Sequence, residues 1–321
     1  MNRRAFLAVV LGAACVPSAA GAQQSARIQR IGWLDYSSSS ENLGTFVQAM
    51  VSRGWVDGKT FRIEYRGGEG RPERLSAAAG ELTRLPVDAI VAPGVAEALA
   101  ARRATDSIPI VMTAVDDPVA LGLVASFARP GGNVTGLATA RSELDGKLLS
   151  LLREFLPRAT SAGVIVDATD PQHTSILRHL REAAGRLGLT INAAPVSRHT
   201  EVDPAFAAFK RQGTPMVVVV PSSMFIPNWI ADLALKHGLP LASTAPGYVF
   251  EGGLMGYSED WNAVYDRAAT IVDRILKGAK PAGIPVELPT KFKLIVNAKT
   301  ARALRLSVPQ SIMIRSDAVI D

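Results

Sequence analysis

Short apolar, β-branched segments alternate with longer amphipathic segments along the chain from Ile28 onward. Apolar runs of about four to eight residues are typical of strands that are buried on both faces. In the first half of the chain, the strands expected on this basis are 28–34, 61–65, 89–92, 109–113 and 134–138. Apolar residues at three- and four-residue spacing between them predict helices over 41–53, 72–85, 96–104 and 118–127. Such alternation is typical of βαβ units and a parallel sheet.

A second series with the same rhythm follows a predicted helix over 143–156, with strands expected at 162–166, 190–193, 216–220 and 239–243. Matching Trp33 to Ile165 gives an offset of 132 residues, and matching Met112 to Ser243 gives 131. Repetition of one α/β unit predicts two similar lobes. The predicted fold class is therefore α/β, with two doubly wound parallel-sheet lobes joined by a three-strand hinge.

The end of the chain is expected to cross between these lobes. Another helix is predicted over 260–276, and the hinge strands are placed near 136–139, 254–258 and 286–289. On this division, lobe 1 comprises residues 28–137 and 258–284, and lobe 2 comprises residues 138–256 and 287–321. A chain of 321 residues is long enough for two cores.

The first 22 residues are typical of a signal peptide. Arg3 and Arg4 precede an apolar run over 5–16, and the small residues of 20–22 follow it, so cleavage is expected near Ala22 and the protein is expected in the periplasm. The motif Arg-Arg-x-Phe-Leu leaves the Tat and Sec routes both open. Cys15 is not expected to carry a lipid, because residues 12–14 lack the large aliphatic residue of a lipoprotein signal.

Charge gives little indication of a partner. The net charge of +6 comes from Lys and Arg scattered among acids, with no basic run of five residues. This distribution is typical of a solvated surface, and no nucleic-acid partner is expected.

Candidate binding residues follow the predicted strands, because ligands of open parallel sheets bind beyond the carboxyl ends of the strands. These positions are rich in small, hydroxyl and carboxylate side chains, which suit both ligand binding and ordinary helix capping. Asp117 before Pro118 is suited to capping, whereas Asp116 is the candidate anchor for a ligand ammonium. The ligand-binding residues selected on this basis are Tyr36, Ser37, Ser38, Ser39, Gly94, Val95, Asp116, Asp167, Asp170, Ser222, Ser223, Thr244, Tyr248 and Tyr257.

Motifs for nucleotide binding and hydrolysis are absent from the sequence. Residues 58–60 read Gly-Lys-Thr, but the spacing from Gly54 is too short for a P-loop, and a strand is predicted to follow. There is no G-x-S-x-G motif, and no G-x-G-x-x-G follows the first strand. His173, His179, His199 and His237 lack metal-ligand spacing. We therefore expect no catalytic residue, no metal and no cofactor.

Several longer motifs resemble one family. They are Asp117-Pro118-Val119 with residues 121–124, the run Arg129-Pro130-Gly131-Gly132-Asn133-Val134-Thr135-Gly136, residues 251–258, residues 274–281, and residues 289–292 running on to Asn297. In these segments the chain resembles the ABC-transporter substrate-binding proteins of the TrpX-like group. The resemblance implies a type I periplasmic binding fold, no catalysis, a monomer, and delivery of a small molecule to permease and ATPase subunits at the inner membrane.

Some members of this group are linked to aromatic amino acids, and the resemblance places the loops named above around such a ligand. One departure is the segment Asp167-Ala168-Thr169-Asp170-Pro171, which stands where many relatives have an asparagine-rich loop. Its two acids disfavour a ligand carboxylate at that rim. Two further readings remain: a periplasmic sensor that signals to a membrane receptor, and a secreted α/β hydrolase that uses Asp116 with a serine or histidine.

Overall fold

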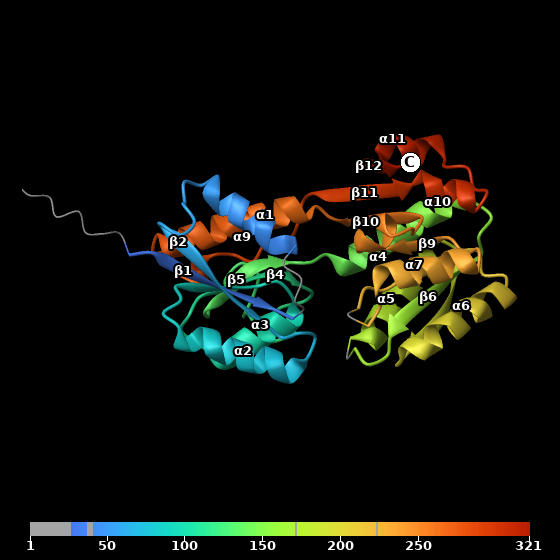
Figure 1. Ribbon diagram of the computed structural model, residues 1–321. Helices are drawn as coiled ribbons and strands as arrows, with labels where there is room; N and C mark the ends of the chain where they lie inside the picture. Colours follow the sequence, from blue (N-terminus) through green and yellow to red (C-terminus); the bar gives the residue numbers. More distant parts are fainter. Residues whose placement is uncertain (1–26, 37–40, 171, 223) are drawn as a thin grey trace, which may run out of the picture.

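The computed structural model describes residues 27–36, 41–170, 172–222 and 224–321, which form two α/β lobes (Figure 1). The sheet of the first lobe has the order β2-β1-β3-β4-β5, and all its neighbouring strands are parallel. Its strands are β1 (Gln29–Asp35), β2 (Phe61–Gly67), β3 (Ala89–Ala92), β4 (Ile110–Val115) and β5 (Val134–Ala138).

Helices cover both faces of this sheet, so most residues of β1, β3, β4 and β5 are buried, whereas most residues of the edge strand β2 are half-buried. One face packs on α2 (Pro72–Arg84) and α3 (Val95–Ala104), with Leu34 and Met112 in the shared core. The other packs on α1 (Glu41–Val51) and α9 (Trp261–Leu276), with Trp33 and Val111 in theirs. Burial on two faces explains why these strands appear in the sequence as continuous apolar runs.

The sheet of the second lobe has the order β12-β11-β10-β9-β8-β6-β7. Its pairs are parallel except that β11 runs antiparallel to β10. The strands are β6 (Ser161–Asp167), β7 (Thr190–Val196), β8 (Val217–Val219), β9 (Leu241–Ser243), β10 (Met255–Glu259), β11 (Phe292–Asn297) and β12 (Ala318–Ile320).

This second sheet is also covered on both faces. Val164 and Val218 point into a core that includes α4 (Arg141–Phe155) and α5 (His173–Arg186), whereas Ile165 and Val219 point into the opposite core. The remaining helices are α6 (Val202–Arg211), α7 (Pro227–Lys236), α8 (Gly247–Phe250), α10 (Ala298–Ala303), α11 (Gln310–Arg315) and the 3₁₀ turns His199–Glu201 and Pro281–Gly283.

Three crossings connect the lobes: after β5, after β10 and before β11. Hydrogen bonds tie the crossings together. The amide of Glu287 donates to Gly136 O at 3.0 Å, and the amide of Ala138 donates to Glu287 O at 2.9 Å. Thr139 Oγ1 donates to Glu259 Oε1 at 2.6 Å. The predicted two-lobe fold with a three-segment hinge is thus confirmed.

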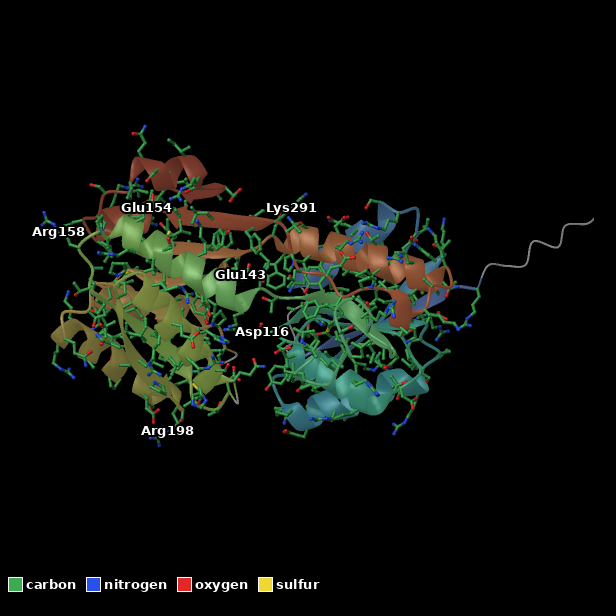
Figure 2. The ribbon with its side chains drawn as sticks, turned by 180° about the vertical axis from the view of Figure 1, so that it is seen from behind. Asp116, Glu143, Glu154, Arg158, Arg198 and Lys291 are labelled. Atoms are coloured by element: carbon green, nitrogen blue, oxygen red, sulfur yellow. The ribbon has the colours of Figure 1, made fainter. Side chains whose placement is uncertain are left out.

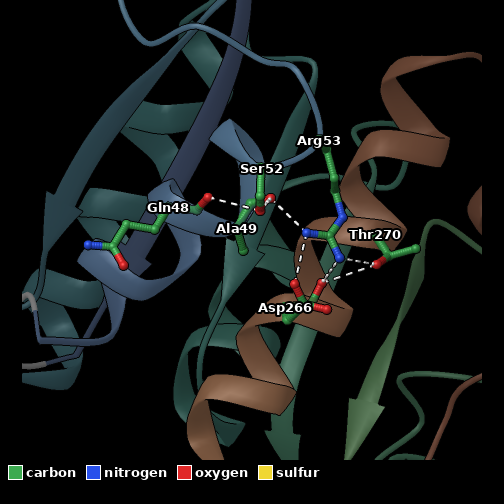
Figure 3. Close-up of polar contacts among 6 residues, drawn as sticks. All are labelled: Gln48, Ala49, Ser52, Arg53, Asp266 and Thr270. Atoms are coloured by element: carbon green, nitrogen blue, oxygen red, sulfur yellow. Dashed lines mark hydrogen bonds and ion pairs between the residues drawn. The ribbon is translucent and has the colours of Figure 1, made fainter.

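Arg53 attaches α9 to the first lobe, although α9 lies far along the chain (Figure 3). Its Nη1 donates to Ala49 O at 2.7 Å and to Asp266 Oδ1 at 2.9 Å. Its Nη2 donates to Asp266 O at 2.8 Å and to Thr270 Oγ1 at 2.7 Å. The guanidinium therefore bridges the end of α1 and the middle of α9.

We expect Arg53→Leu to lower the free energy of unfolding by about 2 kcal/mol, because several bonds from one charged group are lost together. The control is Arg178→Leu, which removes the exposed pair with Glu182 and should cost about 0.5 kcal/mol or less. Urea unfolding of both variants measures the difference. Equal losses would show that the Arg53 contacts add nothing beyond a surface ion pair.

One predicted helix, 118–127, is wrong. The structure has turns there, with Asp117 at φ 40° and Gly122 at φ 68°, which a continuing helix does not allow. The helical spacing in the sequence arises because Leu123 and Val124 are buried against the first lobe. The strand β11 was also not predicted, although Leu294, Ile295 and Val296 are apolar and buried.

Among the helices that the structure describes, none is both long enough and apolar enough to cross a membrane.

Candidate functional site

A cavity of about 480 Å³ lies between the two lobes, and we call it the cleft pocket. The first lobe contributes the residue after β1 and parts of α2 and α3, and the second contributes the loops after β6 and β8. The residues lining it are Tyr36, Pro72, Leu75, Ser76, Ala96, Leu99, Ala100, Arg103, Asp167, Thr169, Asp170 and Ser222. Four residues chosen from the sequence, Tyr36, Asp167, Asp170 and Ser222, are thus brought together.

On the first-lobe side, Glu97 holds the loop after β1 against the start of α3. Its Oε1 accepts a hydrogen bond from the Tyr36 amide at 3.0 Å, and the side chain is buried. Burial raises the pKa of Glu97 above its usual value, because it outweighs the hydrogen bonds from backbone amides. A Cβ at Gly94 would lie 2.6 Å from Glu97 Oε2, so glycine at this position makes room for the carboxylate.

On the second-lobe side, Asp167 organises the pocket wall. Its Oδ1 accepts from the Thr169 amide at 2.8 Å and from Thr169 Oγ1 at 2.6 Å, and its Oδ2 accepts from Ser222 Oγ at 2.6 Å. Burial raises the pKa of Asp167, but the hydrogen bonds from Ser222 and Thr169 outweigh it, so the pKa lies below its usual value. Asp167 is thus ionised and fixes both hydroxyl groups at the pocket.

A second group of charged residues lies nearer the crossings, and we call it the hinge charge cluster: Asp116, Arg141, Asp145 and Glu259. Asp116 comes from the loop after β4, Arg141 and Asp145 from the first turns of α4, and Glu259 from the end of β10. Figure 2 places Asp116 close to the end of α4 that carries Glu143. Asp145 and Glu259 are 3% and 4% exposed, respectively.

The acids of this cluster affect one another electrostatically. Burial raises the pKa of Asp116, while the charges of Arg141 and His179 lower it. For Asp145, burial and the charges of Asp116 and Glu259 outweigh the attraction of Arg141 and raise the pKa from 3.8 to about 6. The cluster therefore contains acids that are costly to ionise beside a cation.

The other selected residues lie elsewhere. Tyr248 is buried in the second lobe, where its hydroxyl donates to Phe225 O at 2.9 Å. Tyr257 stacks on Phe292 with ring centroids 5.8 Å apart. Val95 packs on the core beside α3, and Thr244 is half-buried after β9. Ser37, Ser38, Ser39 and Ser223 lie outside the described residues.

Sequence analysis missed Glu97, Arg103, Arg141, Asp145 and Glu259. The sequence did indicate that Asp145 is buried. It lies three and four residues before Leu148 and Leu149, and therefore on the same face of the predicted helix. A carboxylate on the apolar face of a predicted helix is unusual and indicates a buried charge. Within the described part of the chain, no group of His, Cys, Asp and Glu is arranged to hold a metal ion.

Two α/β lobes around a cleft are the architecture of the type I periplasmic binding fold, and solved structures share this fold. A protein from Streptococcus pneumoniae solved in complex with L-Trp has a TM-score of 0.82 at 22% identity, over 91% of this chain and 100% of the other. A ligand-free, open substrate-binding protein with adhesive properties from Clostridium difficile has a TM-score of 0.73 at 23% identity, over 91% and 99%.

The chain belongs to the ABC transporter substrate binding protein family, which matches residues 31–320. It is also similar to a tyrosine-binding protein of Clostridioides difficile (strain R20291), with 28% identity over 278 residues, covering 85% of this chain and 79% of the relative. The resemblance found in the sequence motifs is confirmed. The family is one of binding proteins rather than enzymes.

Proposed function

We propose that this protein captures an aromatic amino acid in the cleft by closure of the two lobes, and delivers it to the permease and ATPase of an ABC importer. The observation that carries the proposal is the cleft pocket, which draws its wall from both lobes. Because each lobe supplies part of the wall, a ligand that contacts both stabilises the closed arrangement.

The composition of the cleft supports this ligand class. A volume of about 480 Å³ is sufficient for an aromatic amino acid and is typical of small-molecule sites. Tyr36 and Leu99 line the cleft pocket and offer apolar surface for a ring. Asp116, which follows β4 and does not line this pocket, offers a carboxylate for an ammonium group nearer the hinge. Asp167 is occupied by hydrogen bonds within its own loop, so we assign it a structural role in the pocket wall.

Similar proteins also support the proposal. The curated relative is described as tyrosine-binding, and one of the solved neighbours is in complex with L-Trp. We further propose that residues 1–22 form a signal peptide cleaved near Ala22, and that the mature protein works as a monomer in the periplasm. A protein collected from the periplasm with an amino terminus near residue 23 would support the cleavage.

Thermal shift and calorimetry with L-tyrosine, L-tryptophan, L-phenylalanine, L-leucine and D-ribose test the ligand class. A ligand at about 100 times its Kd adds about 2.7 kcal/mol of stability, which raises Tm by roughly 4 °C in a protein of about 300 residues. We expect the aromatic amino acids to produce this shift. A shift with ribose alone, or with none of the panel, would contradict the proposal.

Asp116→Asn is expected to weaken binding of an aromatic amino acid roughly 10- to 100-fold, because the ion pair between the carboxylate and the ammonium is replaced by a hydrogen bond to an uncharged amide oxygen. The control is Asp106→Asn, which changes an exposed acid before β4, at the end of that strand opposite to Asp116. Calorimetry of both variants gives the affinities. Unchanged affinity in Asp116→Asn would remove this residue from the site.

A further inference from the structure

Arg141, the first residue of α4, carries hydrogen-bond donors that its surroundings leave unused. Its side chain is half-buried. Within the described part of the chain, its Nε and Nη2 are buried and have no hydrogen-bond partner. Buried donors of a charged group are costly when unpaired, so native proteins almost always satisfy them. A group that pairs with this edge of the guanidinium would therefore be strongly favoured.

The neighbouring acids do not provide that group. Arg141 begins α4 directly after the crossing that follows β5, and its charge lowers the pKa of both Asp116 and Asp145. Among the described residues, however, no ion pair or hydrogen bond joins Arg141 to either acid. Glu259 instead accepts from Thr139 Oγ1 at 2.6 Å. The guanidinium is thus attracted by acids that it does not contact.

The charge balance of the hinge charge cluster indicates what would fit. Asp116 and Asp145 both feel the charge of Arg141, and Glu259 acts on Asp145, so a ligand that is only anionic is repelled by these carboxylates. A ligand that is only cationic leaves Arg141 unpaired. A zwitterion fits both conditions, because its ammonium pairs with Asp116 while its carboxylate takes the Nε–Nη2 edge, which accepts a carboxylate through two parallel hydrogen bonds.

We propose that Arg141 is a specificity-determining residue that binds the carboxylate of a zwitterionic amino acid, with its Nε and Nη2, at the hinge end of the cleft. This inference rests on the proposed function and deepens it. Arg141 is only half-buried, so rotation about the terminal bonds of its side chain turns the shielded donors toward the cleft. Arg141 then distinguishes amino acids from the corresponding amines, and Asp116 distinguishes them from the corresponding acids.

The test compares ligands that differ only in the carboxylate. Calorimetry measures the affinities of L-tyrosine and tyramine, L-tryptophan and tryptamine, and L-phenylalanine and phenethylamine for the wild type, Arg141→Gln and Arg141→Lys. We expect the wild type to prefer the amino acid, and Arg141→Gln to lose roughly 10- to 100-fold for the amino acid but little for the amine. Arg141→Lys keeps the charge without the two-bond geometry, so an intermediate loss is expected.

The matched control is Arg158→Gln, the same change at an exposed arginine at the far end of the second lobe from Asp116 (Figure 2). It should leave both affinities unchanged. Circular dichroism and Tm establish whether each variant is folded. If Arg141→Gln is not folded, the affinities of Arg141→Lys decide the test.

The inference would be overturned, while the binding function stands, if Arg141→Gln kept the wild-type preference for the amino acid over the amine, whether both affinities stayed the same or fell equally. A wild type that binds the amine at least as tightly as the amino acid would also overturn it. Failure of the wild type to bind any member of the panel is different, because it removes the proposed function itself and is seen before any variant is measured.

Discussion

Replacing Gly136 with alanine is expected to lower the free energy of unfolding by roughly 3 kcal/mol or more, because backbone strain and a steric clash add at this position. Gly136 has φ 133°, a conformation that side chains with a Cβ rarely adopt. A Cβ there would lie 2.0 Å from Met112 O and 2.7 Å from Met112 N. These are backbone atoms of the neighbouring strand, so no side-chain rotation relieves the contact.

Neither strand can move aside without further losses. Met112 pairs with Ala92 of β3 as well as with Gly136, and its side chain is fully buried. Gly136 O also accepts from the Glu287 amide at 3.0 Å, so a displacement of β5 passes directly to another crossing of the hinge. We therefore expect Gly136→Ala to weaken ligand binding as well as stability.

Urea unfolding of Gly136→Ala is compared with that of Gly132→Ala. The comparison separates the destabilisation caused by the clash from the general effect of replacing a glycine on the free energy of unfolding. Gly132 lies in the turn before β5, and a Cβ there has nothing within 4 Å. Its replacement should change the free energy of unfolding by less than about 1 kcal/mol. Similar values for the two variants would show that β4 and β5 adjust to the added carbon.

Most of the parallel strands were predictable because they are buried on both faces. The segment Val134–Ala138 has the apolar residues Val134, Leu137 and Ala138 and no charged residue, and the structure has a fully buried strand with the same bounds. Thr135 fits there because its Oγ1 donates to Ile284 O at 2.7 Å. Apolar runs of this kind are determined locally, since burial of the whole segment requires them whichever strands are its neighbours.

Features that depend on distant contacts were not predictable. The apolar residues of segment 118–127 have helical spacing, but the segment forms turns. Asp117 and Gly122 have positive φ angles, and Leu123 is buried. The strand β11 was missed because its antiparallel partner β10 lies across the whole of α9 in sequence. A pattern of apolar residues does not indicate which sheet will accept the segment.

The candidate site likewise contains some residues that the sequence predicted and others that it did not. Tyr36 and Ser222 follow strands, so the rule for parallel sheets found them, and the structure brings both to the cleft pocket. Arg141 and Asp145 belong to a helix, and Glu259 ends a strand close to a crossing. Only the arrangement of the three crossings brings these residues beside Asp116, and the sequence does not contain that information.

Asp145→Asn is expected to stabilise the protein above about pH 6, because it removes a charge that is costly to bury. Asp145 is 3% exposed, and burial, Asp116 and Glu259 together outweigh the attraction of Arg141. A rise of the pKa from 3.8 to about 6 corresponds to a cost on the order of 3 kcal/mol for the ionised form. Asparagine keeps the size of the side chain without the charge, so most of this cost is removed.

The pH dependence distinguishes this cause from a simple improvement in packing. The folded protein holds a proton on Asp145 up to about pH 6, whereas the unfolded chain loses it near 3.8. The free energy of unfolding of the wild type, relative to that of Asp145→Asn, therefore falls as the pH rises from about 4 to about 6. The variant is expected to have no advantage in stability below about pH 4 and its full advantage above about pH 6. Urea unfolding at pH 4, 5, 6 and 7.5 measures it, with exposed Asp232→Asn as the control. An advantage that is the same at every pH would show that better packing, and not the removed charge, is its cause. A loss of stability at pH 7.5 would show that the ionised carboxylate of Asp145 stabilises the fold.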